Sequence, residues 1–242
     1  MKTSILLILM MVLSLGASAQ FHVLKEEIEV KPPIFMGTAV SVVDNGASLD
    51  DFVAQRMIYP EQDLKLHREG TEVIQFTVNT NGTLSDFEVV NSVSPNMDAE
   101  LIRVLQLTNG MWRPGSNNDG HTEMRSELAI ACKIRLYEGS DRQTDFQKVA
   151  TKYFQKGSKL LYTKNHPRRA LSNFDEGIRY LPYDANLLVM RGYARYALGD
   201  LAGAIEDWEI VKEKTDIDNL KEIAGNYHDL EGYAELLAEF EK

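Results

Sequence analysis

The residue types that most often carry chemistry are scattered along this chain. Its 242 residues include five histidines, and none has a second ligand at the spacing that a helical metal site needs. The single cysteine, Cys132, has no intramolecular partner. No serine lies in a nucleophile elbow, and no glycine-rich loop could cradle a phosphate. We therefore expect no catalytic residue, no metal and no cofactor.

The remaining candidates have simpler structural interpretations. Asp50-Asp51 and Glu206-Asp207 are neighbouring carboxylates, but adjacent residues on a helix point apart, so we interpret both pairs as parts of solvated faces. Cys132 ends an apolar run that is typical of a strand, which favours a buried thiol over a reactive one. An enzyme whose catalytic groups lie far apart in the sequence stays an alternative.

The charge of the chain is unevenly distributed. A net charge of −10 argues against a general nucleic-acid binder, which needs a basic face for phosphates. Residues 146–174 carry seven lysines and arginines and no acid, and Lys148, Lys152 and Lys156 share a helix face. Residues 200–242 carry thirteen acids and four bases. The basic face could meet an acidic partner or an anionic surface. The slightly preferred interpretation is a solvated face that the acidic end of the same chain balances.

The first residues have the pattern of a secretory signal. Lys2 precedes an apolar run at 5–15, and Ala17-Ser18-Ala19 follows, which predicts cleavage between Ala19 and Gln20 and a periplasmic mature chain. The apolar run is shorter than the roughly 20 residues of a membrane-spanning helix, so we expect no stable span in the mature chain. A signal that stays as an anchor is the alternative.

The central element that the sequence predicts is a hairpin within residues 69–92. Apolar and polar residues alternate in its first strand, with Ile74, Phe76 and Val78 on one face. Asn81-Gly82 suits a tight turn, because glycine adopts a positive φ at little cost. The alternation changes phase between Leu84 and Phe87, which predicts a bulge near Ser85-Asp86.

Helical patterns lie on both sides of this hairpin. Ser48 is suited to cap a helix that Tyr59-Pro60 ends, and a second helix is expected at about 97–108. A third strand follows at about 124–136. The predicted order of helix, strand, strand, helix and strand is an α+β layer over residues 48–137. Residues 20–47, which contain Lys31-Pro32-Pro33, are expected to be an extended lead-in.

This order of elements, with the residues at its turns and at the ends of its helices and strands, resembles the C-terminal domain of the TonB family over about residues 33–137. The signature positions are Tyr59, Pro60, Gly70, Gly82, Trp112, Pro114 and Gly115. The resemblance implies a domain that binds an extended segment of a partner beside its last strand. The positions implied for this contact are Met124, Arg125, Ser126, Glu127, Leu128, Ala129 and Ile130. Arg125 and Glu127 could select the partner's charge, unless a dimer mate or the helices that follow cover this edge.

Residues 144–242 form an all-α region in this interpretation, after a linker at 138–143. Thr144 and Gln147 suggest a capping box. A set of positions recurs in type after about thirty-four residues: Gly157, Ala170, Phe174 and Pro182 match Gly192, Ala204, Trp208 and Asp216. This pattern resembles the tetratricopeptide repeat, which implies a partner-binding groove. In the second unit its residues would be Asn186, Val189, Tyr193 and Tyr196.

The sequence thus predicts a periplasmic adaptor or scaffold of the cell envelope, in which a TonB-like domain precedes tetratricopeptide-like repeats. We expect protein partners, with an outer-membrane transporter as one candidate, and no nucleic acid; a homodimer is left open. The main alternative is a membrane-anchored TonB-type energy transducer. A periplasmic enzyme of unrecognised type is the second alternative.

Overall fold

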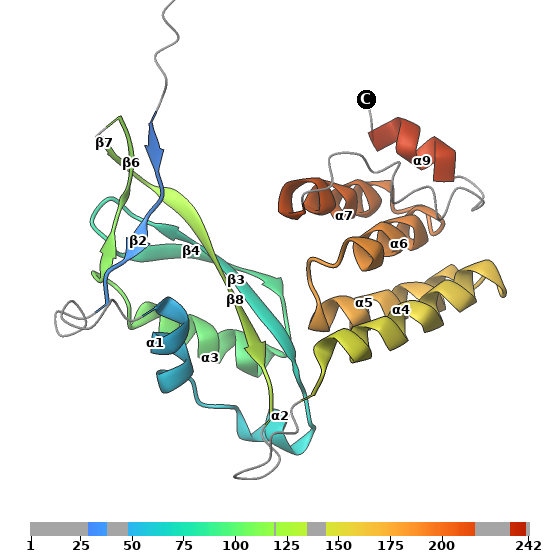
Figure 1. Cartoon of the computed structure of the whole chain (residues 1–242), viewed down its shortest axis with the longest axis horizontal. Helices are drawn as coiled ribbons and strands as arrows, with labels where there is room; N and C mark the ends of the chain where they lie inside the picture. The colour runs from blue at the N-terminus through green and yellow to red at the C-terminus, as the bar shows by residue number, and fades with distance from the viewer. Residues whose placement is uncertain (1–28, 38–47, 119, 135–143, 216–232, 241–242) are drawn as a thin grey trace, which may run out of the picture.

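The computed structural model describes residues 29–37, 48–118, 120–134, 144–215 and 233–240. Within these residues, strands and three helices come first and a set of helices follows, as Figure 1 shows. This arrangement confirms the predicted order of an α+β region and then a helical region. The predicted cleavage site at Ala19 and Gln20, and the linker at 138–143, lie outside the described residues.

The main sheet has three antiparallel strands in the order β4-β3-β8. Their bounds are β3 Gly70–Val78, β4 Leu84–Asn91 and β8 Met124–Cys132. Ile74, Phe76 and Val78 of the central strand are fully buried on one face. Side chains of α3 and α1 cover that face, with Leu101 and Val104 of α3 and Phe52 of α1 in the same apolar cluster. Alternation along β3 therefore builds the core of the α+β region.

The β3–β4 hairpin has the predicted turn and bulge. Gly82 has a φ of +79°, and a Cβ atom at this position would lie 2.5 Å from the carbonyl oxygen of Trp112. The pairing between β3 and β4 shifts register between Gln75 and Thr77, whose partners are Glu88 and Ser85. Asp86 lies in the shifted segment with a φ of +49°. The phase change in the sequence therefore marks an irregularity of β4.

Three helices belong to this region: α1 Leu49–Arg56, α2 Glu61–Lys65 and α3 Pro95–Gln106. Ser48 caps α1 as predicted, because its side chain accepts a hydrogen bond from the amide of Asp51 at 3.1 Å. The helix α3 begins two residues earlier than the sequence analysis expects. Ser94 caps it, and Pro95 occupies its first turn, where the missing amide hydrogen costs nothing. The short helix α2 was not predicted.

Part of the lead-in pairs with strands that come much later in the chain. Strand β1 (Val30–Lys31) pairs with β6 (Gly115–Asn117), and β2 (Ile34–Phe35) pairs with β5 (Trp112–Arg113). Strand β7 (Gly120–Thr122) lies on the other side of β6. The ring of Phe35 lies against Trp112, with 5.4 Å between their centroids. The segment around Pro32-Pro33 is therefore extended and contributes to the core of the α+β region.

The helical region contains α4 Phe146–Tyr162, α5 Pro167–Tyr180, α6 Ala185–Tyr196, α7 Leu201–Lys214 and α9 Tyr233–Phe240. The start of α4 differs from the prediction. Asp145 caps it by accepting from the amide of Lys148 at 3.1 Å, while the Thr144 hydroxyl donates to the carboxylate of Glu69 in the other region. The cap by Asp145, one residue later in the chain, therefore replaces the predicted capping box.

The helices pack in two similar pairs. At Gly157 of α4, a Cβ atom would lie 2.5 Å from the ring of Phe174 in α5. At Gly192 of α6, it would lie 2.6 Å from the indole of Trp208 in α7. Both aromatic side chains are fully buried. The glycine–aromatic pairs identified by their spacing in the sequence are therefore close-packed contacts within each helix pair, with no room for a Cβ atom at either glycine.

Candidate partner-binding surfaces

Strand β8 is the more regular of the two outer strands of the main sheet. It pairs with β3 without a register shift from Met124 opposite Val78 to Cys132 opposite Gly70. Within the described residues, no strand pairs with its other side. The opposite outer strand, β4, has two register shifts. Bulges discourage the addition of a further strand, so β8 is the better acceptor of the two.

The predicted contact residues of β8 are divided between the two faces of the sheet. Ser126, Leu128 and Ile130 lie opposite residues of β3 that face the core, and Leu128 is buried there. Arg125, Glu127 and Ala129 lie opposite Thr77, Gln75 and Val73, on the other face. Arg125 and Ala129 are exposed. An added strand would meet alternating apolar and polar positions, as strand pairing requires.

Both charged residues predicted to meet a partner are engaged within the chain. Arg125 forms an ion pair with Glu88 of β4. The carboxylate of Glu127 accepts hydrogen bonds from Gln75 and from Lys214 of α7, each at 3.0 Å. Burial acts to raise the pKa of Glu127, but the hydrogen bonds from Gln75 and Lys214, the nearby hydroxyl of Tyr183 and the charge of Lys214 outweigh it and hold that pKa below its usual value. Each of these two charges therefore has an oppositely charged neighbour within the folded chain, and their role in selecting a partner stays a prediction.

The helical region docks on the same face of the sheet as Glu127. The hydroxyl of Thr71 in β3 donates to the carbonyl oxygen of Tyr180 at 2.7 Å. The side-chain amide of Asn91 in β4 donates to the carbonyl oxygen of Arg179 at 3.2 Å. In Figure 1 the helices α4–α7 lie on one side of the sheet, and α1 and α3 lie on the other. Lys214 of α7 thus contacts the side chain of Glu127, whereas Ala129 stays exposed; that the helices cover the edge itself stays a prediction.

Two of the four residues predicted to line a groove on the second helix pair are buried. Val189 is fully buried and Tyr193 is 6% exposed, because both belong to the apolar core of the helices. Asn186 is exposed and lines a hollow of about 220 Å³ between α4 and α6, which also includes Gln147 and Phe154. Tyr196 is half-buried at the end of α6. A partner on this surface would therefore contact Asn186 and residues of α4.

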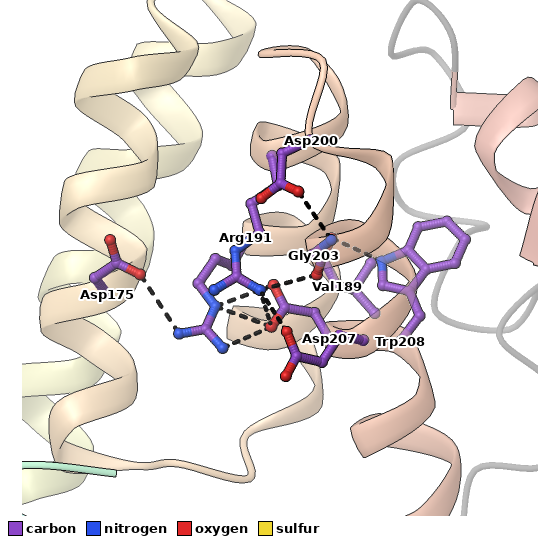
Figure 2. Close-up of polar contacts among 9 residues, drawn as sticks. Asp175, Val189, Arg191, Asp200, Gly203, Asp207 and Trp208 are labelled. Atoms are coloured by element: carbon purple, nitrogen blue, oxygen red, sulfur yellow. Dashed lines mark hydrogen bonds and ion pairs between the residues drawn. The ribbon is translucent and has the colours of Figure 1, made fainter. Parts of the chain in front are cut away.

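A network of ion pairs connects the three helices α5, α6 and α7. It was not predicted from the sequence. Asp207 of α7 is fully buried, and its carboxylate contacts the guanidinium group of Arg191 at 2.6 Å, as Figure 2 shows. It also contacts the guanidinium group of Arg195, at 3.0 Å. Arg191 also reaches Asp175 of α5 at 3.4 Å. The interpretation of Glu206-Asp207 as a solvated face is therefore wrong for Asp207. Its neighbours come from other helices, so local spacing carried no signal of this network.

Cys132 and Trp112 both have structural roles. Cys132 is 1% exposed, and burial, with a smaller contribution from Glu72, raises the pKa of its thiol to about 12, so it stays protonated and unreactive. Trp112 packs against Phe76 and Phe35, and its indole nitrogen donates to the hydroxyl of Thr108 at 2.9 Å.

In the described part of the chain, no group of three or more His, Cys, Asp or Glu residues could hold a metal ion.

The remaining signature positions shape the ends of the sheet. The hydroxyl of Tyr59 donates to the carbonyl oxygen of Arg68, and Pro60 precedes α2. Gly70 begins β3, while Pro114 separates β5 from β6, where Gly115 packs against Met124. These residues fix the loops that flank β3 and β8 and thereby position the candidate edge.

The comparison with known families covers this region. Residues 55–134 match the family of the Gram-negative bacterial TonB protein C-terminal. The match runs from the end of α1 to just beyond β8, so it includes the candidate edge of the TonB C-terminal domain. This family is a protein-interaction domain, and the match confirms the resemblance for this part of the chain. The helical region lies outside the match, and a search of curated proteins found no match to the chain.

Proposed function

We propose that this chain is an interaction protein of the Gram-negative cell envelope, an adaptor or scaffold, whose TonB C-terminal domain receives an extended partner segment beside β8. The observation that carries the proposal is the regular edge from Met124 to Ile130, which no described strand covers. Backbone amide and carbonyl groups along such an edge give affinity, and alternating side chains give selectivity. The family match supports a protein as the partner, and an outer-membrane transporter is the leading candidate.

We further assign the helical region to the tetratricopeptide type. The support is geometric. Within each of the two helix pairs, a glycine of the first helix, Gly157 or Gly192, packs directly against a buried aromatic residue of the second helix. In this assignment, α9 packs on the second helix pair, α6 and α7. The ring centroids of Phe240 in α9 and Trp208 in α7 are 5.7 Å apart. The hollow beside Asn186 would be a second contact surface for protein partners.

A photo-crosslinking experiment tests the edge. A photoreactive amino acid replaces Ala129, whose side chain is exposed on β8, and the matched control replaces Val90, which is 38% exposed on β4. We expect envelope proteins to crosslink at position 129 and not at position 90, with an outer-membrane transporter among them. Equal crosslinking at both positions, or only crosslinks between copies of this chain at 129, would contradict partner binding at β8.

The mature N-terminus distinguishes the adaptor from an energy transducer. A transducer would keep the apolar run at 5–15 as an anchor, whereas the proposed periplasmic protein would begin at Gln20. Among the described helices, none is both long and apolar enough to cross a membrane. The mass of the protein isolated from cells decides between the two: a chain that starts at Gln20 supports the adaptor, and an intact Met1 supports the transducer.

A further inference from the structure

The exposed side of α4 carries four lysines and no acid. Lys148, Lys152, Lys156 and Lys159 are all exposed. With 3.6 residues per turn, their directions around the helix axis fall within an arc of about 80°. The helix has no acid in its 17 residues. Like charges at this spacing destabilise a helix, so the stability of α4 does not explain the pattern.

This face continues into a basic hollow at the junction with α5. The hollow has a volume of about 280 Å³ and is lined by Lys156, Lys159, Leu160, Lys164, Arg169 and Asn173. It contains four cationic side chains and no carboxylate. The six cations Lys148, Lys152, Lys156, Lys159, Lys164 and Arg169 form one surface, which we call the basic face. In Figure 1, α4 and α5 lie at the end of the helical region opposite α9.

Several acids of the described helices pair with cations outside the basic face. On α5, Asp175 pairs with Arg191 and Glu176 pairs with Arg179. On α7, the buried Asp207 pairs with arginines of α6. Only Lys148 of the basic face has an acidic partner among the described residues, Asp145 at 3.6 Å. Within residues 200–215 and 233–240, the described part of the acidic end, no acid forms an ion pair with a cation of the basic face.

We propose that the basic face binds the anionic headgroup surface of a membrane. Within the described residues, no hydrogen bond fixes the cationic groups of Lys152, Lys159 or Arg169, so they can follow the fluid phosphates of lipids. A site for an acidic peptide would be expected to hold its hydrogen-bond donors in fixed directions, because ordering them on binding costs free energy. The side-chain amide of Asn91, which donates to Arg179, is an example of a donor held in this way. A solvated end of a helical array would be polar too, but it would not need charges of one sign.

Vesicle co-sedimentation of the full chain tests this proposal. The probes are vesicles of phosphatidylglycerol mixed with phosphatidylcholine, and vesicles of phosphatidylcholine alone, which report any binding through apolar segments. Each cation near an anionic bilayer contributes roughly fivefold in affinity. We expect the variant Lys152→Glu/Lys156→Glu/Lys159→Glu to bind the anionic vesicles at least about 100-fold more weakly, and salt to weaken the binding of the unmodified chain.

The matched control reverses three exposed cations outside the basic face, in the variant Lys65→Glu/Arg113→Glu/Lys212→Glu. It has the same net charge as the first variant and is expected to keep most of the binding. Lys164→Glu/Arg169→Glu is a second test if the first variant unfolds, as circular dichroism would show. Equal losses in the control, or no preference for anionic vesicles, would overturn the proposal. Stronger release by inorganic phosphate than by chloride at equal ionic strength, or binding to polyglutamate in place of vesicles, would overturn it too.

Discussion

At the scale of single residues, the buried carboxyl group of Glu72 is the main electrostatic cost in the α+β region. Its side chain is fully buried, and its Oε2 atom accepts from the amide of Val93 at 2.9 Å. Its Oε1 atom has no hydrogen-bond partner among the described residues, and the carboxyl group of Asp98 interacts with the Glu72 side chain. A protonated Glu72 can donate a hydrogen bond to that group. Burial first, and then Asp98, raise the pKa of Glu72 to about 9.

We predict that Glu72→Gln stabilises the protein at pH 8 and changes little at pH 4. Below about pH 4.5 Glu72 is protonated in both the folded and unfolded states; above it only the unfolded chain ionises, so the free energy of unfolding falls as pH rises to about 9. At 1.36 kcal/mol per unit, the gain at pH 8 is at most about 5 kcal/mol. Urea denaturation at both pH values measures it. The exposed control Glu123→Gln should show no such pH dependence, and an equal effect of both variants would contradict the prediction.

At the scale of elements, glycines set the distance between paired helices. Glycine inside a helix costs roughly 0.5–1 kcal/mol relative to alanine, so its presence in α4 and α6 needs a packing reason. The structure supplies one, because the ring of Phe174 occupies the space where a Cβ atom of Gly157 would be, and Trp208 does the same at Gly192. The indole nitrogen of Trp208 also donates to the carbonyl oxygen of Val189 at 3.2 Å.

We predict that Gly157→Ala destabilises the helical region by about 1–3 kcal/mol despite the better helix propensity of alanine. The added methyl group would force the ring of Phe174 out of a close-packed position. Thermal unfolding followed by circular dichroism measures the change. Gln155→Ala, at an exposed position of the same helix, is the control and should be neutral or slightly stabilising. Partial recovery in Gly157→Ala/Phe174→Leu would show that the ring is the cause; a stabilised single variant would contradict this account.

At the scale of the whole molecule, the helices and the sheet are joined by contacts between residues far apart in the sequence. The end of α5 meets β3 at Gly70 and Thr71, and α7 meets β8 through Lys214 and Glu127. This second contact lies on the candidate acceptor strand itself. A partner that adds beside β8 would therefore lie close to the helical region, and the two proposed partner-binding surfaces can influence each other.

We predict that Gly70→Ala loosens the docking of the helical region. A Cβ atom at this position would lie 2.7 Å from the carbonyl oxygen of Arg179, so α5 must move away and the hydrogen bond from Thr71 to Tyr180 would be strained. Amide hydrogen exchange at residues 177–183 should become at least about tenfold faster, equivalent to about 1.4 kcal/mol. Gly120→Ala is the control, because Gly120 has no positive φ and a Cβ atom there would meet only the carbonyl oxygen of Asn117, at 3.3 Å. Unchanged exchange in the Gly70 variant would show that docking does not depend on this approach.

The sequence by itself determined the features that depend on neighbours along the chain. The alternation of β3, the turn at Gly82, the bulge near Asp86 and the glycine–aromatic spacing all agree with the structure. Strand alternation, positive-φ turns and helix spacing follow from local backbone geometry, so they can be inferred from one sequence. The TonB-like resemblance also rested on such local punctuation, and the family match covers that region.

Only the tertiary structure decided which polar groups are available at the surface. Glu127 and Lys214 are 87 residues apart in the sequence, and Asp207 meets Arg191 from another helix, so no spacing rule brings them together. Burial of Val189 and Tyr193 depends on which side of α6 its neighbours cover. The energy of a charge depends on its partners and solvent exposure in three dimensions. Long-range packing therefore decides which predicted contact residues a partner can reach.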